Sequence, residues 1–247
     1  MESSNSTVFD LSFFSNKEFI KKEDSKEIFV SIILNMPFKD NLAKSFLKLS
    51  NLIICADGGA NRLYDYDQYI LPTIITGDFD SIRDEVKEFY KQKNVNLIHR
   101  KDTRITDFEK CLYILLEKIS DIVEKNEYDY ELNFNIAIFG ASGGKMDHTF
   151  SNYYLLSKYA ISIRELVKSK IFICGENSLS MILSDKEENH IKLADFTNNQ
   201  NGFSVFPLFS TVNITITEKS KTKSLTDYAI DTFLERSELV DFNLYSK

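Results

Sequence analysis

The segment PTIITGDFDSI (residues 72–82) joins a short apolar run to a glycine and then to two carboxylates, Asp78 and Asp80. A β-branched apolar run bounded by proline and glycine predicts a buried strand. Two like charges directly behind such a strand repel each other and lose solvation, so by themselves they do not stabilise the fold. We therefore expect a positively charged group to lie between them.

Comparable units lie on either side of this segment. Further strands are predicted at 28–35, 51–56, 95–99 and 133–140, and helices at 40–50, 57–66, 81–92, 106–119 and 146–160. Strands and helices alternate, and their connections are too long for hairpins. This order predicts an α/β fold of the Rossmann-like kind, a mostly parallel sheet with helices on both faces.

Two of the predicted helices carry start signals. Ser81 is expected to cap the helix at 81–92, and Thr106 with Glu109 has the spacing of a capping box. The helix that follows Thr106 places apolar residues on one face, which we expect to be buried. These residues are Phe108, Cys111, Leu112, Leu115, Leu116 and Ile119.

The pattern changes after about residue 168. Short strand-like runs follow, separated by polar turns and without a clear amphipathic helix: KIFICG, SLSMIL, HIKLA, GFSVFPL and TVNITITE. They predict a smaller all-β sandwich domain. The expected division is therefore an α/β domain over 1–168 and a β-sandwich domain over 169–247.

Glycine is sparse and concentrated. Six of the 8 glycines fall in three short stretches that follow predicted strands: Gly58 and Gly59, Gly77, and Gly140 with Gly143 and Gly144. The carboxyl ends of parallel strands share one edge of the sheet, where ligands bind. Asp57, Asp78, Asp80, Asp102, Asp107 and Asp147 should converge there. The alternative is that these residues only form turns and helix caps.

Clustered carboxylates without histidine or cysteine partners favour a hard cation such as Mg²⁺, and glycine loops offer backbone N–H groups to phosphate. The pattern therefore predicts a Mg²⁺–nucleotide enzyme that catalyses phosphoryl-type transfer. GASGGKM (140–146) is not a P-loop, because it is one residue short and Met146 replaces Ser or Thr. A nicotinamide cofactor has little support, since no G-x-G-x-x-G is present.

Charge and composition exclude some partners. The net charge is -7 and no long basic block occurs, which argues against nucleic acid or an anionic membrane as the main partner. No apolar stretch approaches the ~20 residues of a spanning helix, and the first residues lack a signal-peptide pattern. Cys55, Cys111 and Cys174 resemble buried thiols, so we expect a cytoplasmic protein.

Five motifs together resemble the thiamine pyrophosphokinase family in order and approximate spacing. They are IILNMP, ICADGGANRLYD, PTIITGDFDSI, TDFEKCL and GASGGKMDHTFSN, and the resemblance covers about residues 28–160 and continues weakly through FSVFPL. It implies an α/β nucleotide-binding domain followed by a β-sandwich, in a homodimer with active sites at the subunit interface. The implied reaction transfers the pyrophosphoryl group of ATP to the hydroxyl of thiamine and releases AMP.

The resemblance also implies site residues. Asp78, Asp80 and Asp102 would bind Mg²⁺, and Asp107 would contact thiamine or metal. The catalytic set would thus be Asp78, Asp80, Asp102 and Asp107. Nucleotide and phosphate contacts would come from Asp57, Gly58, Gly59, Asn61, Ser81, Thr106, Ser142, Gly143, Gly144, Lys145 and Asp147.

Two departures from the family pattern concern the metal and the acceptor. Arg104 stands where the family usually has a carboxylate. The chain has no Trp, and SKTKSL (220–225) replaces the segment that usually offers an aromatic ring to thiamine. Two alternatives therefore stay open: a related diphosphotransferase or nucleotide hydrolase with another acceptor, and a non-catalytic nucleotide-binding paralogue.

Overall fold

The computed structural model describes two units of the chain. The described residues are 6–10, 26–38, 40–126, 132–175, 179–183, 188–192, 202–203, 212–218, 221–228, 234–235 and 239–246. One unit spans Ile20–Ile182, and the other combines Met1–Phe19 with Leu183–Lys247.

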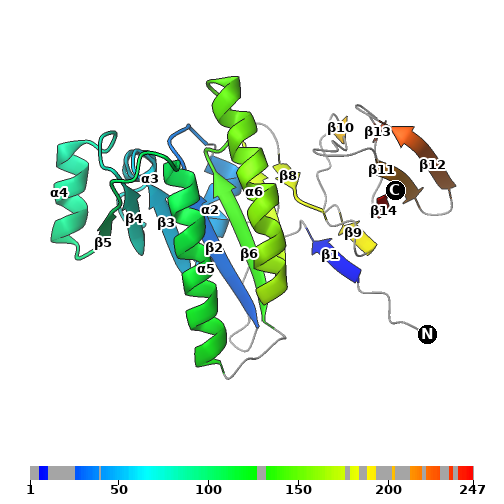
Figure 1. The fold of residues 1–247 in the computed structure, drawn as a ribbon, viewed down its shortest axis with the longest axis horizontal. Coiled ribbons are helices and arrows are strands. Elements are labelled where there is room, and N and C mark those ends of the chain that lie inside the picture. The colour runs from blue at the N-terminus through cyan, green and yellow to red at the C-terminus, as the bar shows by residue number, and fades with distance from the viewer. Residues whose placement is uncertain are drawn as a thin grey trace. The chain divides into compact units, whose positions relative to one another are not determined.

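A seven-stranded sheet forms the centre of the first unit (Figure 1). Its strands in spatial order are β5 (Asn96–His99), β4 (Ile74–Gly77), β3 (Leu52–Ala56), β2 (Glu27–Ile33), β6 (Asn133–Phe139), β7 (Lys168–Cys174) and β8 (Leu179–Met181). All neighbouring pairs are parallel except β7 with β8. The chain adds β3, β4 and β5 on one side of β2 and then crosses to β6 on the other. In open α/β sheets such a switch in direction marks where ligands bind.

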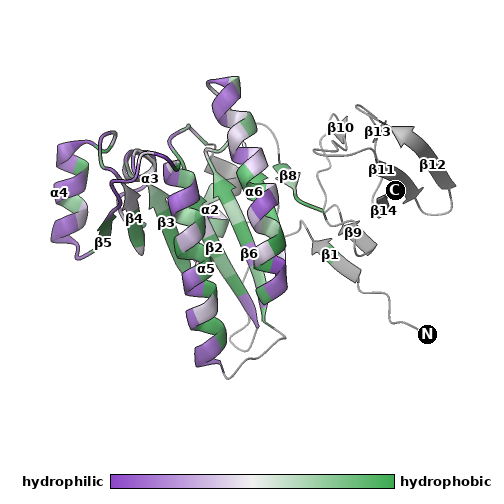
Figure 2. Ribbon diagram, viewed as in Figure 1, coloured by the Kyte–Doolittle hydropathy of each residue, from purple (hydrophilic) through white to green (hydrophobic). Residues whose placement is uncertain are grey.

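Helices cover both faces of this sheet, as predicted. They are α2 (Asp40–Leu49), α3 (Gly59–Tyr66), α4 (Asp84–Gln92), α5 (Asp107–Lys125) and α6 (Met146–Leu166). In Figure 1, α5 and α6 lie in front of the strands and α2 lies behind them. Side chains of β2 alternate between the faces: Ile32 joins the core under α5 and α6, while Phe29 packs edge-on against Phe46 of α2. The strands of this sheet are mostly apolar, whereas the helices also carry hydrophilic residues (Figure 2).

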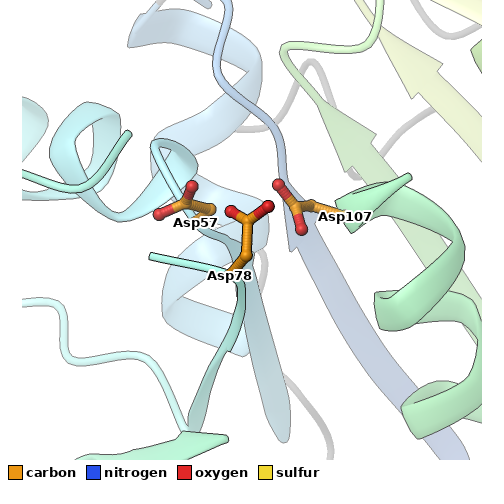
Figure 3. Close-up of side chains that lie close together, drawn as sticks. All are labelled: Asp57, Asp78 and Asp107. Atoms are coloured by element: carbon orange, nitrogen blue, oxygen red, sulfur yellow. The ribbon is translucent and has the colours of Figure 1, made fainter. Parts of the chain in front are cut away.

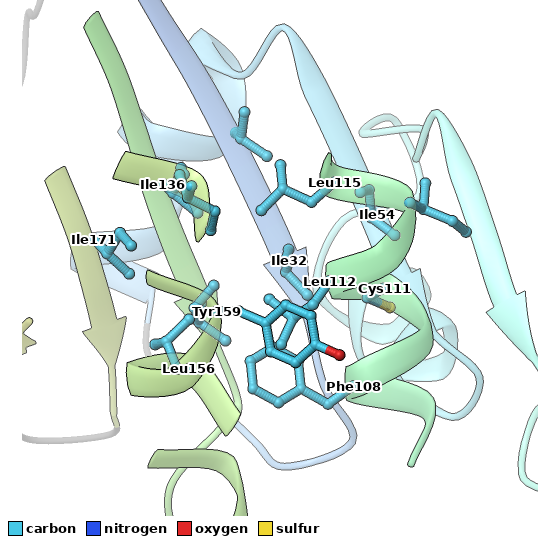
Figure 4. Close-up of a cluster of buried hydrophobic side chains, with 14 of the residues drawn as sticks. Ile32, Ile54, Phe108, Cys111, Leu112, Leu115, Ile136, Leu156, Tyr159 and Ile171 are labelled. Carbon is cyan, nitrogen blue, oxygen red and sulfur yellow. The ribbon is translucent and has the colours of Figure 1, made fainter. Parts of the chain in front are cut away.

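The core beneath α5 and α6 draws on strands β2, β3, β4, β6 and β7 (Figure 4). Ile32, Ile54, Ile136 and Ile171 meet the two helices at one buried cluster, to which Phe108, Cys111, Leu112 and Leu115 of α5 and Leu156 and Tyr159 of α6 contribute. The predicted buried face of α5 is confirmed, with Leu116 only partly buried. This packing holds the first turn of α5 against the edge of the sheet.

One predicted helix start is confirmed and one is wrong. The Oγ1 atom of Thr106 accepts a hydrogen bond from the backbone N–H of Glu109 at 3.1 Å, so Thr106 caps α5. Ser81 does not cap the next helix, because α4 begins at Asp84 and its cap position is Arg83. Ser81 instead donates its backbone N–H to Asp57 and its hydroxyl to Asp80.

The predicted division after residue 168 differs from the one observed. β7 pairs with β6 over its whole length and β8 pairs with β7, so the segment up to Ile182 belongs to the α/β unit. Strand-like sequence by itself does not say which sheet a strand joins. β1 (Ser6–Asp10), which was assigned to the α/β domain, pairs with β9 (Glu188–Lys192) in the other unit.

The second unit is rich in strands, as predicted. One sheet has the order β1-β9-β14-β11-β12, with β14 (Leu239–Ser246), β11 (Val212–Glu218) and β12 (Lys221–Tyr228); β10 (Gly202–Phe203) pairs with β13 (Leu234–Glu235). The sandwich arrangement stays a prediction. The rest of the predicted strand GFSVFPL, residues 204–208, lies outside the described residues.

Among the described helices, none combines the length and the apolar character needed to cross a membrane.

Substitution of Leu112 by alanine should destabilise the α/β unit by about 2–5 kcal/mol, because the side chain is fully buried under α5 and its loss leaves a cavity. Leu71→Ala is the matched control, since Leu71 is exposed and should change the free energy of unfolding by less than about 1 kcal/mol. Urea unfolding measures both. Equal effects would contradict the core as described.

Candidate functional site

Three carboxylates meet at the carboxyl edge of the seven-stranded sheet (Figure 3). Asp57 directly follows β3, Asp78 directly follows β4, and Asp107 is the first residue of α5. One carboxylate oxygen of each lies within 4.8 Å of the other two. Asp57 is buried, while Asp78 and Asp107 are partly buried. These three residues are called the carboxylate cluster below.

Glycine at the end of β4 makes this approach possible. A Cβ atom on Gly77 would lie 2.6 Å from the Cβ of Asp57 and 3.1 Å from Oδ1 of Asp107. Real Cβ atoms essentially never approach as closely as the first of these distances, so any other residue would push Asp57 away from Gly77. The predicted importance of this glycine therefore has a geometric cause.

Asp57 is held by the loop that follows β4. Its two carboxylate oxygens accept the backbone N–H groups of Ser81 and Ile82, each at 3.0 Å. Burial raises the pKa of Asp57 to about 6. The two hydrogen bonds act in the opposite direction and lower this pKa, while the negative charge of Asp107 and the side chain of Asp80 raise it further. The backbone of Asp57 has φ 40°, a conformation that costs free energy in a residue other than glycine and is concentrated at functional sites.

The predicted metal ligands are only partly brought together. Asp78 belongs to the carboxylate cluster, but Asp80 and Asp102 do not. Asp80 accepts the hydroxyl of Ser81 at 2.7 Å. Asp102 accepts Nε of Arg104 at 2.9 Å and a second guanidinium nitrogen at 2.8 Å, which holds the pKa of Asp102 well below its usual range. The structure places Asp57 in the cluster, where sequence reasoning had assigned it to the phosphate pocket.

The residue between Asp78 and Asp80 shapes this loop. Phe79 has φ 64°, so the chain turns between the two carboxylates. Its ring stacks on His99 at a centroid distance of 5.2 Å and an interplanar angle of 19°, and Nζ of Lys87 lies 4.7 Å from its centroid. These contacts hold the turn, and the turn separates two carboxylates that the sequence pattern treats as equivalent.

The loop after β6 forms a second part of this edge, at the switch point of the sheet. Gly140, Gly143 and Gly144 all have positive φ, and a Cβ on Gly140 would lie 2.5 Å from the carbonyl oxygen of Met36. Asn152 of α6 donates to the carbonyl of Ala141 at 2.8 Å and so ties the loop to the helix. The predicted nucleotide contacts of this loop are exposed or partly exposed: Ser142, Gly143, Gly144, Lys145 and Asp147.

The remaining predicted nucleotide contacts have structural partners. Gly59 allows α3 to start close to β2, since a Cβ there would lie 2.1 Å from the carbonyl oxygen of Ile33. Gly58 is similarly crowded by the side chain of Asn35. Asn61 donates to the carbonyl of Ser81 at 2.9 Å and accepts the N–H of Arg83 at 3.0 Å. Contacts of these residues and of Thr106 with a nucleotide stay predictions.

Sequence reasoning missed Lys110. This residue lies one turn after Asp107 on α5, its side chain is 1% exposed, and its Nζ atom contacts Oδ1 of Asp107 at 2.7 Å. A lysine four residues before the apolar Ile114, on the same side of the helix, was the available signal, because a buried ammonium needs a charged partner.

The donor set of the carboxylate cluster fits a magnesium ion. Its ligand atoms are all carboxylate oxygens, which hard cations prefer, and three such groups leave positions for substrate oxygens. Neither histidine nor cysteine contributes to the cluster, so the donors do not favour zinc.

Comparison with known proteins identifies a family. Residues 43–168, just over half of the chain, match the family model described as thiamin pyrophosphokinase, catalytic domain. A rice (Oryza sativa subsp. japonica) thiamine pyrophosphokinase 1 is 31% identical over 56% of this chain and 54% of the relative. An Arabidopsis thaliana thiamine pyrophosphokinase 2 is 35% identical over 58% of this chain and 54% of the relative. The chain thus aligns with about half the length of these curated relatives.

Solved structures share the fold. Thiamin pyrophosphokinase from Candida albicans superposes with a TM-score of 0.71, covering 99% of this chain and 90% of that one at 19% identity. The yeast enzyme superposes with a TM-score of 0.69, covering 99% of this chain and 89% of that one at 21% identity.

The wild type and Asp57→Asn can be compared by their free energies of unfolding, with a chelator present. The wild-type value minus the variant value should fall by up to about 2 kcal/mol as the pH rises from about 4 to above 6. The reason is that a carboxyl whose pKa is raised on folding binds more protons when folded, so a rising pH favours unfolding over this range. Urea unfolding at pH 4.5 and pH 7 measures the difference.

Asp102→Asn is the control for this measurement. The pKa of Asp102 is lowered on folding, so its contribution is retained above pH 4 and is lost only as the pH falls further. A wild-type stability that rises relative to Asp57→Asn between pH 4.5 and pH 7 would contradict the raised pKa.

Proposed function

Because the chain belongs to the thiamin pyrophosphokinase family, we propose that it transfers the pyrophosphoryl group of ATP to the hydroxyl of thiamine, giving thiamine diphosphate and AMP. The observation that carries this proposal is the carboxylate cluster at the carboxyl edge of the sheet. Asp57, Asp78 and Asp107 all lie inside the segment that matches the family model. Three acidic groups in one place fit a reaction in which phosphate charge must be offset by a cation.

Asp57, Asp78 and Asp107 would hold Mg²⁺, which would supply positive charge to the phosphate oxygens. The protein's own task is then to orient these carboxylates. Ser81 and Ile82 fix both oxygens of Asp57, and Lys110 fixes one oxygen of Asp107. Positioned groups of this kind lower the barrier to phosphoryl transfer mainly by alignment and charge, with little covalent work.

The glycine loop after β6 would bind the nucleotide. Its exposed backbone at Gly143 and Gly144 has no side chain to block the approach of a phosphate group. Lys145 at the start of α6 adds a positive charge beside these N–H groups. The loop and the carboxylate cluster lie at the same edge of one sheet, so one triphosphate could contact both.

The remaining parts of the proposal come from the family resemblance. We propose that the active form is a homodimer in the cytoplasm and that residues of the second unit help to bind thiamine. Part of SKTKSL, Lys221–Leu225, lies in β12. Asp80 and Asp102 are proposed to contribute to catalysis or to metal binding once substrate is bound.

Arg104 favours a second candidate, a non-catalytic nucleotide-binding paralogue. Its guanidinium binds both oxygens of Asp102, so one predicted metal ligand is already paired. This pair is largely exposed and therefore weak, so a cation with phosphate could displace the arginine.

Incubation with ATP, thiamine and Mg²⁺ should yield AMP and thiamine diphosphate in equal amounts, measured by chromatography. Asp78→Asn should lower the rate by about a hundredfold or more, because it removes a charge from the carboxylate cluster. Asp84→Asn, an exposed residue at the start of α4, is the matched control and should keep the wild-type rate. Formation of ADP instead of AMP would refute the assigned reaction.

Arg104→Asp separates the two candidates. If the wild type is an active enzyme, it forms AMP without this substitution. If the wild type binds ATP in calorimetry but forms no AMP, and Arg104→Asp forms it, the paralogue reading is correct. Arg100→Asp changes a partly exposed arginine that pairs with Glu117, and should not create activity.

A further inference from the structure

We propose that Lys110 is the resident counter-ion of the carboxylate cluster and that it lowers the affinity of this cluster for a free divalent cation. This inference rests on the proposed function only in taking the cluster as the cation site. It assigns an electrostatic role to a residue that the sequence did not predict and that the proposed reaction uses only to orient Asp107. Lys110 is a positioning residue here, because it acts through Asp107.

The burial of Lys110 requires an electrostatic reason. Its side chain is 1% exposed, on a helix whose neighbouring residues Cys111 and Leu112 are fully buried in the core. Burying an ammonium group is costly unless it is paired, and an apolar residue at this position would pack without that cost. Its one ion pair among the described residues is with Asp107, at 2.7 Å.

Two arginines near this edge form ion pairs with carboxylates outside the cluster. Arg104 binds Asp102, and Arg83 binds Asp65 and Glu85. Within the part of the chain that the structure describes, Lys110 is thus the cation whose ion pair reaches the carboxylate cluster. It also fixes the side chain of Asp107 by binding one of its two oxygens and leaving the other available.

Lys110 changes the charge balance of the site. Three ionised carboxylates carry a charge of −3, and the ammonium reduces this to −2. One divalent cation then neutralises the site, so an incoming triphosphate meets no net negative charge. Without Lys110 the same site with one cation would keep a charge of −1 and would repel phosphate.

The same ammonium weakens the binding of a free cation. A positive charge that contacts one of the ligands opposes a second positive charge at the other oxygens, and the effect is strong because the site is partly buried. A cation that arrives with phosphate is less affected, since the phosphate brings its own negative charge. Lys110 therefore favours the cation–nucleotide complex over the free cation.

Calorimetric titration of the full chain with Mg²⁺ or Mn²⁺ alone, without nucleotide, tests this role. Lys110→Met removes the charge and keeps most of the volume, and Lys110→Gln also keeps an N–H donor for Asp107. Both should bind the free cation about tenfold more tightly than the wild type. Both should also have a lower Tm in chelator and a larger rise in Tm when the cation is added.

Lys118→Met is the matched control. Lys118 lies on the same helix and pairs with an aspartate three residues on, Asp121, at 2.6 Å, but its side chain is 42% exposed. The substitution makes the same change in net charge, and the cation affinity should stay within about twofold of wild type because solvent and salt screen this position.

Each result decides between the readings. The proposal is overturned if a folded Lys110→Gln variant binds the cation as tightly as the wild type or more weakly. It is also overturned if neither Lys110→Met nor Lys110→Gln folds with Mg²⁺ present. Folding of a variant only when the cation is present supports it. Absence of cation binding in the wild type and in every variant would instead overturn the cation site itself, which belongs to the proposed function.

Discussion

The repulsion between three carboxylates is the constraint on which the site depends. A parallel sheet brings the ends of β3 and β4 and the start of α5 to one edge, so acidic residues there are forced together. The fold offsets this repulsion at defined points. The backbone N–H groups of Ser81 and Ile82 bind Asp57, and the ammonium of Lys110 binds Asp107. Gly77 supplies the space in which these groups meet.

The packing of the helices holds these groups in place. The face of α5 that includes Leu112 and Leu115 is buried with strands of the sheet, so the helix start that carries Asp107 cannot retreat from the edge. Asp57 and Phe79 have positive φ, and such conformations cost about 1–3 kcal/mol each in residues other than glycine. The core on both faces of the sheet stabilises the unit against this cost, as is common where binding groups must be preorganised.

Local sequence patterns predicted most of the α/β unit. The alternation of apolar strands with amphipathic helices identified every strand from β2 to β6 and every helix from α2 to α6, because burial on one or both faces imposes a period on the sequence. The membership of β7 and β8 was not predicted, since an isolated apolar strand carries no record of its partner. The predicted start of α4 is too early in the sequence, because Ser81 binds Asp57, a residue distant in sequence, and does not cap the helix.

The sequence by itself determined the edge of the sheet at which acidic and glycine residues gather, because strand ends follow from periodicity and their common edge follows from parallel pairing. It also supplied the motifs that identify the family. Only the tertiary structure decided which carboxylates meet. Asp57, Asp78 and Asp107 come together while Asp80 and Asp102 bind Ser81 and Arg104, and Lys110 lies buried against Asp107. The physical reason is that side-chain direction at a turn depends on backbone torsions such as φ 64° at Phe79, and on partners that no local pattern encodes.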